Sequence, residues 1–482
     1  LKYRRINNIT GWVVFLVALL VYTLTLEPTV SFWDCGEFIL SSFKLQVGHP
    51  PGAPFFLLLG RFFSLFSFGN ESNVAVMINF LSALASAFTI MFLFWTITHM
   101  VRKVFMGDEK QTVINIATVM ASGLIGALTC TFSDTFWFSA VEGEVYATSS
   151  LFTAMVFWAI LKWEDEKQER LKGRWLILIA YLMGLSIGVH LLNLLALPAI
   201  VLVYYFKNYR ISTAGVVKAL LAAFAMLGFI VFILLPYTVK VAGWFELLFV
   251  NGLGLPFHSG LYFYLVILVA ALAYGISYSM KKKKILLNYA ITIVAVILLG
   301  YSSFALIPIR ASAQPPMNQN DPSDVFSMIY YINREQYGST PLLTGNYYTA
   351  PVVDINKKRG GYIQEDDRYV PYQKNDYVFD DRFMTIFPRM YSAEERHHSE
   401  YEYWGQVRGE KVVLNTSGGS REFIIPTFGE NLRFFFRYQL GYMYGRYFMW
   451  NFAGRQNDIQ GNGNVVHGNW ISGIKAIDNS RL

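Results

Sequence analysis

Long apolar runs alternate with short polar links over the first 309 residues of the chain. A helix needs about 20 apolar residues to cross the hydrocarbon core of a bilayer, which is about 30 Å thick. This pattern predicts membrane spans over residues 10–27, 74–101, 113–131, 146–163, 217–236, 260–280 and 285–308. The run 175–206 is too long for one helix, and His190 and Asn193 at its middle indicate a turn between two short or tilted spans. The pattern therefore predicts about nine spans.

Lys and Arg recur in every second link of this pattern. The basic links are 102–112, 164–174, 207–213 and 281–284. Because positively charged links stay in the cytoplasm, these links and the N-terminal "KYRR" are predicted to be cytoplasmic. The links on the opposite side are then 28–73, 132–145 and 237–259, together with everything after 309. The alternation requires the run 175–206 to cross twice.

The composition changes near residue 310, where Tyr, Asn, Asp, Gly and Arg begin to dominate. We therefore expect an all-α, polytopic transmembrane domain over 1–309 and a soluble region over 310–482 on the periplasmic or lumenal side. The polar ending "GIKAIDNSRL" has no closing element, which favours a natural chain that continues further.

The overall composition agrees with a membrane protein. Hydrophobic residues make up 54% of the chain and charged residues 15%, against roughly 25% charged in soluble domains. The net charge of +7 includes the "KKKK" run at 281–284, which we interpret as a topology and lipid-contact signal rather than nucleic-acid binding. The two cysteines, Cys35 and Cys130, do not make a disulfide framework and are expected to be buried.

The link 28–73 is too long to be a simple connection. Its stretch "FWDCGEFILSSFKL" has apolar residues at helical spacing, which predicts an amphipathic interfacial helix. On such a helix Asp34 and Glu37 share a face. The following "GHPPG" ends the helix, and 53–66 is a second apolar helix that carries Arg61.

The acid pair has two interpretations. In the first, Asp34 and Glu37 are helix-end charges that face water, paired to Lys44 or Arg61. In the second, one is a general base and the other tunes it or binds substrate. Burial and a neighbouring carboxylate would both raise a carboxyl pKa and make a better base.

Polar residues recur in the other links on the same predicted side. Glu142, Glu144 and Tyr146 lie in "VEGEVYATSS", and His190 and Asn193 lie in "GVHLLN". A lone His in an apolar helix usually has local partners, but three links with polar groups on one side favour a site.

Arg310 stands where the last span ends, with Asn318 shortly after it. The arginine suits either a snorkelling anchor or a group that binds a lipid phosphate.

Together, "FWDCGEF…GHPPGAP", "VEGEVYATSS" and "GVHLLN" resemble the GT-C glycosyltransferases. The closest resemblance within them is to the protein O-mannosyltransferase-like group, in the family of uncharacterised domains shared by vertebrate transmembrane O-mannosyltransferases and long Bacteroidetes membrane proteins. The likeness covers residues 1 to about 325, and "RYFMWNFAGRQNDIQG" at 446–461 resembles the bacterial branch.

This resemblance implies a polyprenyl-phosphate-linked sugar donor and transfer to a protein hydroxyl, with the sugar expected to be mannose or a similar hexose. Asp34 takes the place of the catalytic acid of the first loop, while Glu37 departs from the group's pattern, which places a second acid directly beside the first. His49 and Pro50 match the pair near the donor phosphate. Glu142, Glu144 and Tyr146 match the second loop that borders the site, and Arg310 suits the phosphate by position.

The transfer needs a base for the acceptor hydroxyl and a cation for the leaving phosphate. Arg61, Arg310 or His49 would supply that cation without a metal. The alternative, a divalent ion held by Asp34 and Glu37, has too few ligands to be favoured. We therefore expect no cofactor, with a lipid-linked sugar, a polypeptide and membrane lipids as partners.

Two other functional classes remain open. One is a transporter of lipid or solute, which would normally show matching repeats; the other is a non-catalytic assembly or secretion factor on the same scaffold. We expect a bacterial inner membrane, with the C-terminal region in the periplasm, or the endoplasmic reticulum with a lumenal C-terminal region in a eukaryotic source.

Overall fold

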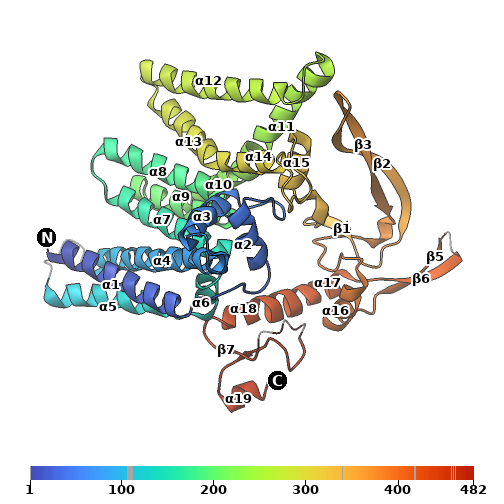
Figure 1. The fold of residues 1–482 in the computed structure, drawn as a ribbon. Helices are drawn as coiled ribbons and strands as arrows, with labels where there is room; N and C mark the ends of the chain where they lie inside the picture. Colours follow the sequence, from blue (N-terminus) through green and yellow to red (C-terminus); the bar gives the residue numbers. More distant parts are fainter. Residues whose placement is uncertain are drawn as a thin grey trace. The chain divides into compact units, whose positions relative to one another are not determined.

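The computed structural model describes residues 2–105, 112–338, 340–416, 419–457, 459, 461 and 463–481. The chain divides into two compact units (Figure 1). The membrane unit contains residues 1–336 and 363–370, and the C-terminal unit contains residues 337–362 and 371–482.

The membrane unit is built from helices. Its long helices are α1 (Lys2–Leu24), α4 (Val74–Phe105), α5 (Val113–Thr131), α7 (Val145–Asp165), α8 (Glu169–Ile187), α9 (Leu197–Asn208), α10 (Thr213–Gly228), α11 (Leu235–Leu247), α12 (Ser259–Lys281) and α13 (Ile285–Tyr301). Its shorter helices are α2 (Cys35–Lys44), α3 (Pro54–Ser64), α6 (Asp134–Ala140), α14 (Leu306–Ala311) and α15 (Val325–Ile332). The predicted helices at "FWDCGEFILSSFKL" and 53–66 are therefore present as α2 and α3.

Eight helical segments of the described residues are long and apolar enough to cross a membrane. The predicted break in 175–206 is confirmed, because α8 ends at Ile187 and the next helical turn starts at Leu191. The remaining predicted span falls on α8, whose sequence opens with the charged "ERLKGR" and is therefore less apolar than the others. The chain is a multi-pass membrane protein.

The predicted loop over 237–259 is wrong. Helical structure runs without a break through Thr213–Gly252, which leaves only a short connection before α12. A π-helical turn over Phe229–Leu234 precedes Pro236, which stands in the first turn of α11. The π-helical turn changes the hydrogen-bond pattern just before Pro236, so the helix continues past a residue that has no N–H to donate.

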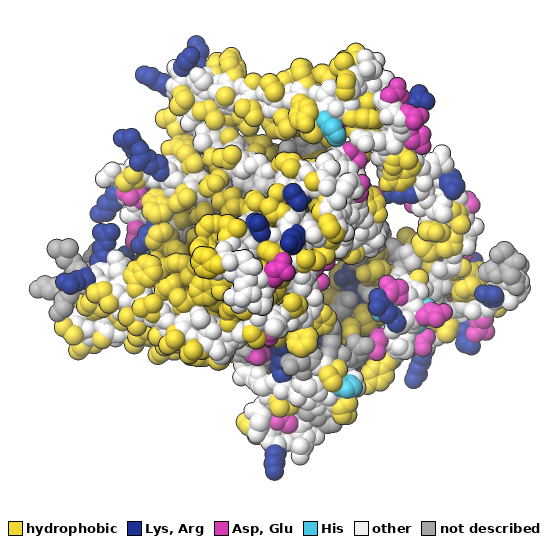
Figure 2. Space-filling view, viewed as in Figure 1, with side chains coloured by type: hydrophobic (Ala, Val, Ile, Leu, Met, Phe, Trp, Pro, Cys, Tyr) yellow, Lys and Arg dark blue, Asp and Glu magenta, His cyan; other side chains and the backbone are white. Residues whose placement is uncertain are grey.

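The basic links gather at one end of the helices. Lys103 at the end of α4 bonds to Glu164 near the end of α7 at 2.6 Å, and Lys207 of α9 donates to the Trp163 carbonyl at 2.8 Å. Figure 1 places the N-terminus and the α12–α13 link at this same end, on the left. Figure 2 shows Lys and Arg side chains at these helix ends and hydrophobic side chains over the helices between. The opposite end, which carries α2, α3 and α6, is called the α2 end below.

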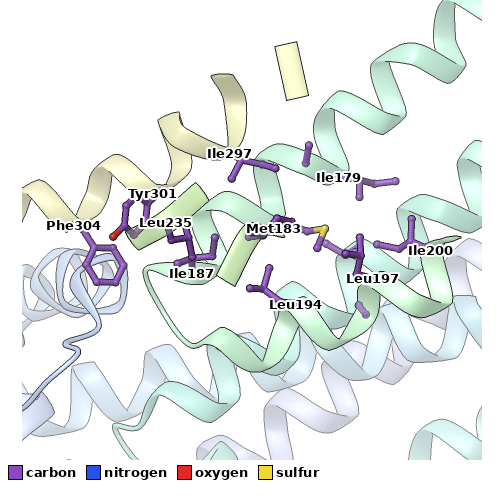
Figure 3. Packing of buried hydrophobic residues seen from close by; sticks show 14 of the residues in the cluster. Ile179, Met183, Ile187, Leu194, Leu197, Ile200, Leu235, Ile297, Tyr301 and Phe304 are labelled. Atoms are coloured by element: carbon purple, nitrogen blue, oxygen red, sulfur yellow. The ribbon is translucent and has the colours of Figure 1, made fainter. Parts of the chain in front are cut away.

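A hydrophobic core joins α7, α8, α9, α11 and α13 (Figure 3). Met183 and Ile187 of α8 pack there with Ile297 of α13. The backbones of α8 and α13 approach closely because two glycines face each other: a Cβ at Gly184 would lie 2.5 Å from the Ile297 carbonyl oxygen. Small residues at such crossings let membrane helices pack backbone to backbone.

The C-terminal unit contains both helices and strands. Its described residues form four two-stranded sheets, which pair β1 with β4, β2 with β3, β5 with β6 and β7 with β8. Its strands are β1 (Thr344–Asn346), β2 (Val352–Glu365), β3 (Arg368–Phe379), β4 (Met384–Ile386), β5 (Glu410–Thr416), β6 (Gly419–Ile425), β7 (Gly454–Arg455) and β8 (Trp470–Ile471). Its helices are α16 (Glu395–Gly405), α17 (Phe428–Phe434), the π-helical η9 (Phe435–Tyr444), α18 (Gly445–Met449) and α19 (Lys475–Asp478). A small aromatic core holds it together, built from Tyr347, Tyr348, Met390, Tyr401 and Phe434.

The turn between β2 and β3 belongs to the membrane unit. The Tyr369 ring lies against Phe257 and Phe326, and its hydroxyl donates to the fully buried Glu246 of α11 at 3.2 Å. Asn251 accepts from the Tyr369 backbone N–H at 2.9 Å and donates to its carbonyl at 2.7 Å. This hairpin tip is therefore fixed to α11 by the Tyr369 side chain and to the helical turn Leu248–Gly252 by its backbone.

The α8–α13 crossing gives a first test. Gly184→Ala places a methyl group against the α13 backbone, so we expect it to lower stability by about 1–3 kcal/mol. Gly228→Ala is the matched control, because its Cβ would meet only Phe232 Cδ2 at 3.9 Å. Thermal unfolding of the detergent-solubilised protein measures both; equal melting temperatures for the two variants would contradict the close approach.

Candidate active site at the α2 end

Helix α2 presents Asp34 at its start. Asp34 is the N-cap residue, yet its carboxylate makes no capping bond to the helix, and the side chain is exposed. The negative charge of Asp34 contributes to the raised pKa values of both His49 and Glu144. Asp34 therefore offers an accessible carboxylate beside His49 and Glu144.

Glu37, one turn further along α2, is engaged with His49. Its Oε1 accepts from the His49 backbone N–H at 2.6 Å and from the ring Nδ1 at 2.8 Å. Burial raises the pKa of Glu37, but these bonds outweigh it and leave the pKa below its usual value. The same hydrogen bond raises the pKa of His49. Both shifts favour a carboxylate that holds a protonated imidazole.

The loop that carries His49 and Pro50 is fixed from the other side by residues that follow the last membrane helix. Tyr331 of α15 donates its hydroxyl to the Gly48 carbonyl at 2.7 Å. Gly52, at φ +72°, closes the turn by donating its N–H to the His49 carbonyl at 2.9 Å. A Cβ at Gly52 would lie 2.9 Å from the Tyr331 hydroxyl, so only glycine suits this position.

The segment after α14 also pairs with this loop. Val47 donates its N–H to the Met317 carbonyl at 3.0 Å and accepts from the Gln319 N–H at 3.1 Å. The Gln319 side chain reaches Glu37 Oε2 at 3.4 Å. Sequence analysis missed Tyr331 and Gln319, because nothing in "YYIN" or "MNQN" marks a contact nearly 300 residues away.

Arg61 and Arg310 lie at the other end of α2. Arg61 donates to the Phe43 carbonyl at 2.7 Å, and Arg310 donates to the Leu45 carbonyl at 2.6 Å and the Lys44 carbonyl at 3.4 Å. These bonds satisfy carbonyl groups that a helix end leaves without partners, and the positive charges suit the negative end of the helix dipole. A ten-residue helix is about 15 Å long, so both guanidinium groups lie away from Asp34.

The second acidic loop is tied to the first. Glu27 donates its N–H to the Val141 carbonyl at 3.1 Å, and the Ser31 hydroxyl donates to Glu142 Oε2 at 2.7 Å. Glu142 is 5% exposed, and burial raises its pKa. Cys35, which is buried with its thiol free, interacts with the same carboxyl. The predicted burial is confirmed for Cys35, whereas Cys130 is only partly buried.

Glu144 is the most perturbed acid of this group. It is 7% exposed, and its Oε2 has no hydrogen-bond partner among the described residues. Burial, followed by the charges of Asp34 and Glu142, raises its pKa to about 8. Glu144 is therefore a neutral acid at pH 7, placed immediately before α7.

Tyr146 and His190 lie next to each other, with ring centroids 5.6 Å apart. His190 Nδ1 accepts from the Leu192 N–H at 3.2 Å, which caps the helical turn that starts at Leu191. Asn193 is fully buried and donates to Ser186 at 2.7 Å. His190 and Asn193 thus shape the turn after α8, as their local interpretation predicts, while Tyr146 is exposed.

A cavity of about 470 Å³ opens beside Tyr146 between α4, α6 and α7. Leu93, Phe136 and Phe157 contribute apolar walls, and Ser149 and Thr153 contribute hydroxyl groups. Most of its lining comes from the membrane-spanning helices α4 and α7, with Phe136 of α6 and Leu192 added.

The structure brings together Asp34, Glu37, His49, Glu142 and Glu144, with Tyr146 and His190 adjacent. Asn318 is apart from them, because its amide donates to the Ala311 carbonyl and to Asp321. No group of three or more His, Cys, Asp or Glu side chains in the described ranges is arranged to hold a metal ion. The expectation that no metal is needed stays a prediction.

The fold and the site together define a class of protein: a multi-pass membrane protein in which two acidic loops meet at one end of the helices. The family comparison agrees: residues 34–213 match the model described as the Protein O-mannosyl-transferase TMEM260 N-terminal domain. The predicted resemblance to O-mannosyltransferase-like membrane proteins is confirmed over that segment. Residues 338–436 match a second model, described as a family of unknown function (DUF8416).

Two relatives carry the same name. The Protein O-mannosyl-transferase tmem260 of Dictyostelium discoideum is 29% identical over 205 residues, which is 41% of this chain and 23% of the relative. The Protein O-mannosyl-transferase TMEM260 of Mus musculus is 29% identical over 175 residues, 36% of this chain and 22% of the relative. The chain thus covers less than a quarter of these relatives. No solved structure matches it.

The state of Glu144 gives a second test. The pKa of Glu144 is about 8 in the folded protein, against 4.5 for an unperturbed glutamate. Between these pH values the folded protein therefore binds more protons than the unfolded chain. Stability must therefore fall as pH rises from 4.5 to about 8. At about 1.4 kcal/mol per pKa unit, the loss is of the order of a few kcal/mol.

We expect Glu144→Gln, which stays neutral, to remove this loss. Melting temperatures in detergent at a series of pH values across that window measure it. Glu71→Gln, an exposed acid in the first loop, should follow the wild-type curve. A Glu144→Gln curve parallel to wild type would show that Glu144 is already ionised.

Proposed function

We propose that this protein is a membrane glycosyltransferase that moves mannose or a similar hexose from a polyprenyl-phosphate-linked donor to a Ser or Thr hydroxyl of a protein. Transfer takes place at the α2 end, with inversion at the anomeric carbon. The relatives' name, Protein O-mannosyl-transferase, supports the reaction class.

One observation carries the proposal: Asp34 is the acid of the cluster that is both accessible and uncommitted. Glu37 is bonded to His49, Glu142 is buried and bonded to Ser31, and Glu144 holds a proton at neutral pH. A general base needs an ionised group that reaches the acceptor hydroxyl. This supports Asp34 over Glu37 as the base.

In the proposed reaction, Asp34 takes the proton of the acceptor hydroxyl as its oxygen attacks the anomeric carbon. The bond from that carbon to the phosphate oxygen breaks, and the polyprenyl phosphate leaves with the bonding electrons. A positive charge must stabilise the leaving phosphate. His49 suits this role, because Glu37 raises its pKa and orients its ring.

The carboxylates of Asp34, Glu142 and Glu144 would repel a phosphate at His49 if all three were ionised. The buried Glu142 and Glu144, whose pKa values are raised, avoid most of this repulsion. Arg61 and Arg310, also predicted to bind phosphate, have their guanidinium groups on the α2 carbonyls. His49 is therefore the better-supported phosphate group.

The cavity beside Tyr146 supports a lipid-linked donor. Its exposed surface is mainly apolar, with some Ser and Thr hydroxyl groups, and lies largely on the membrane-spanning helices α4 and α7, where a polyprenyl chain would leave the bilayer to reach Asp34. The membrane is proposed to be a bacterial inner membrane, with the α2 end on the periplasmic side.

Asp34→Asn is the direct test. Loss of the base should abolish transfer, with a fall in rate of about 10²–10⁴-fold, while the amide leaves folding intact. Mass spectrometry of glycoproteins compares cells with the wild-type protein, a deletion, Asp34→Asn or the control Glu71→Gln. Absence of the same sugar mass in the deletion and Asp34→Asn strains supports the proposal and identifies the sugar; glycans unchanged in both would refute it.

Filling the cavity tests the donor. Ala154→Trp adds bulk to the lining of the cavity, so we expect a raised KM for a polyprenyl-phosphate-linked mannose and a smaller change in kcat. Leu221→Trp, on an exposed position of α10, should leave both values unchanged. An unaltered KM in Ala154→Trp would place the lipid chain elsewhere.

A further inference from the structure

The C-terminal unit contains a second cavity, of about 460 Å³, between η9, α18 and β8. Its size falls in the range of small-ligand sites, roughly 300–1,000 Å³. The residues that line it are largely beyond residue 436, where the match to the family of unknown function ends.

Three arginines line this cavity: Arg437, Arg446 and Arg481. No Asp or Glu is among the lining residues, and none of the ion pairs within the described part of the chain involves these arginines. The charge of Asp478 acts on Arg481, but three guanidinium groups around one cavity still repel each other and favour an anion between them.

Arg446 is the most constrained of the three. It is 2% exposed, and its Nη1 donates to the Tyr442 hydroxyl and to the Gly461 carbonyl, both at 2.8 Å. Its Nε is buried and has no hydrogen-bond partner among the described residues. A buried guanidinium with an unsatisfied N–H is costly, and an anion in the cavity would relieve both the charge and the missing bond.

Aromatic rings supply the walls. Trp404 stacks on Tyr442 at 5.4 Å between centroids, and Trp470 lies beneath the Arg481 guanidinium at 3.4 Å. Asn469, which is 5% exposed, adds an amide to the lining. Flat rings pack against the C–H face of a sugar, while amide and guanidinium groups bond to its hydroxyls.

We propose that this cavity binds an anionic sugar unit, that is, a monosaccharide residue that carries a carboxylate or a phosphate group. The arginines recognise the charge, because a guanidinium group can form two parallel hydrogen bonds to either a carboxylate or a phosphate. The rings and Asn469 recognise the sugar. This site is separate from the proposed transfer reaction and does not depend on it.

The test uses the full chain in detergent. Saturation-transfer NMR and calorimetric titration compare glucuronic acid, mannose 6-phosphate, mannose and inorganic phosphate. We expect both anionic sugars to bind, and mannose and inorganic phosphate each to bind roughly tenfold more weakly or worse, because each lacks one half of the contacts.

Arg437→Gln and Arg481→Gln change exposed residues and are expected to preserve the fold, as a melting temperature equal to wild type would show. Each should weaken both anionic sugars by roughly tenfold. Arg421→Gln, an exposed arginine on β6, removes the same charge and should have no effect.

Three results would overturn the proposal. Absence of binding by both anionic sugars is the first, and binding that Arg437→Gln and Arg481→Gln leave unchanged is the second. The third is inorganic phosphate bound as tightly as mannose 6-phosphate, which would mean that the sugar makes no contact.

Discussion

The bond between Glu37 and His49 is the constraint on which the site depends. Two donors of one residue, a backbone N–H and a ring Nδ1, converge on one carboxylate oxygen. This fixes the loop after α2 back onto the first turn of that helix, beside Asp34. The arginines at the far end of α2 and the Tyr331 hydroxyl then hold the helix and the loop in place. Charge-assisted bonds of this kind are shorter and stronger than neutral ones.

The same bond helps to give the acids of the site different protonation behaviour. Four glutamates and aspartates meet in a small volume at the end of an apolar helix bundle, where their charges would repel. His49 bonds to Glu37, burial raises the pKa of Glu142 and, to about 8, that of Glu144, and Asp34 is left as the exposed acid. Pairs of titratable groups pushed apart in pKa are how a site separates its acids from its bases.

The family match covers the part of the chain where this arrangement is built. Residues 34–213 include both acidic loops, α4 and α7. The braces from Arg310, Gln319 and Tyr331 lie outside that segment, as does the arginine-lined cavity of the C-terminal unit. The acids are thus local to the matched domain, whereas their support comes from the rest of the chain.

The sequence by itself determined the membrane class, most of the helices and the candidate acids. Hydrophobic run lengths identify spans because the bilayer sets one length for all of them. The "GVHLLN" break was correct, whereas α2 already ends at Lys44, before "GHPPG". The sequence pattern was wrong over 237–259, where a link was predicted but the helix continues through Gly252 by way of a π-helical turn.

Only the tertiary structure decided which acid stays available. Helical spacing alone does not separate Asp34 from Glu37, since it places both on one face; only the family resemblance favoured Asp34. Their difference comes from His49, twelve residues further along, and from Glu144 and Gln319, which approach from other elements. Burial and long-range hydrogen bonds set carboxyl pKa values, and neither can be read from the order of residues along a chain.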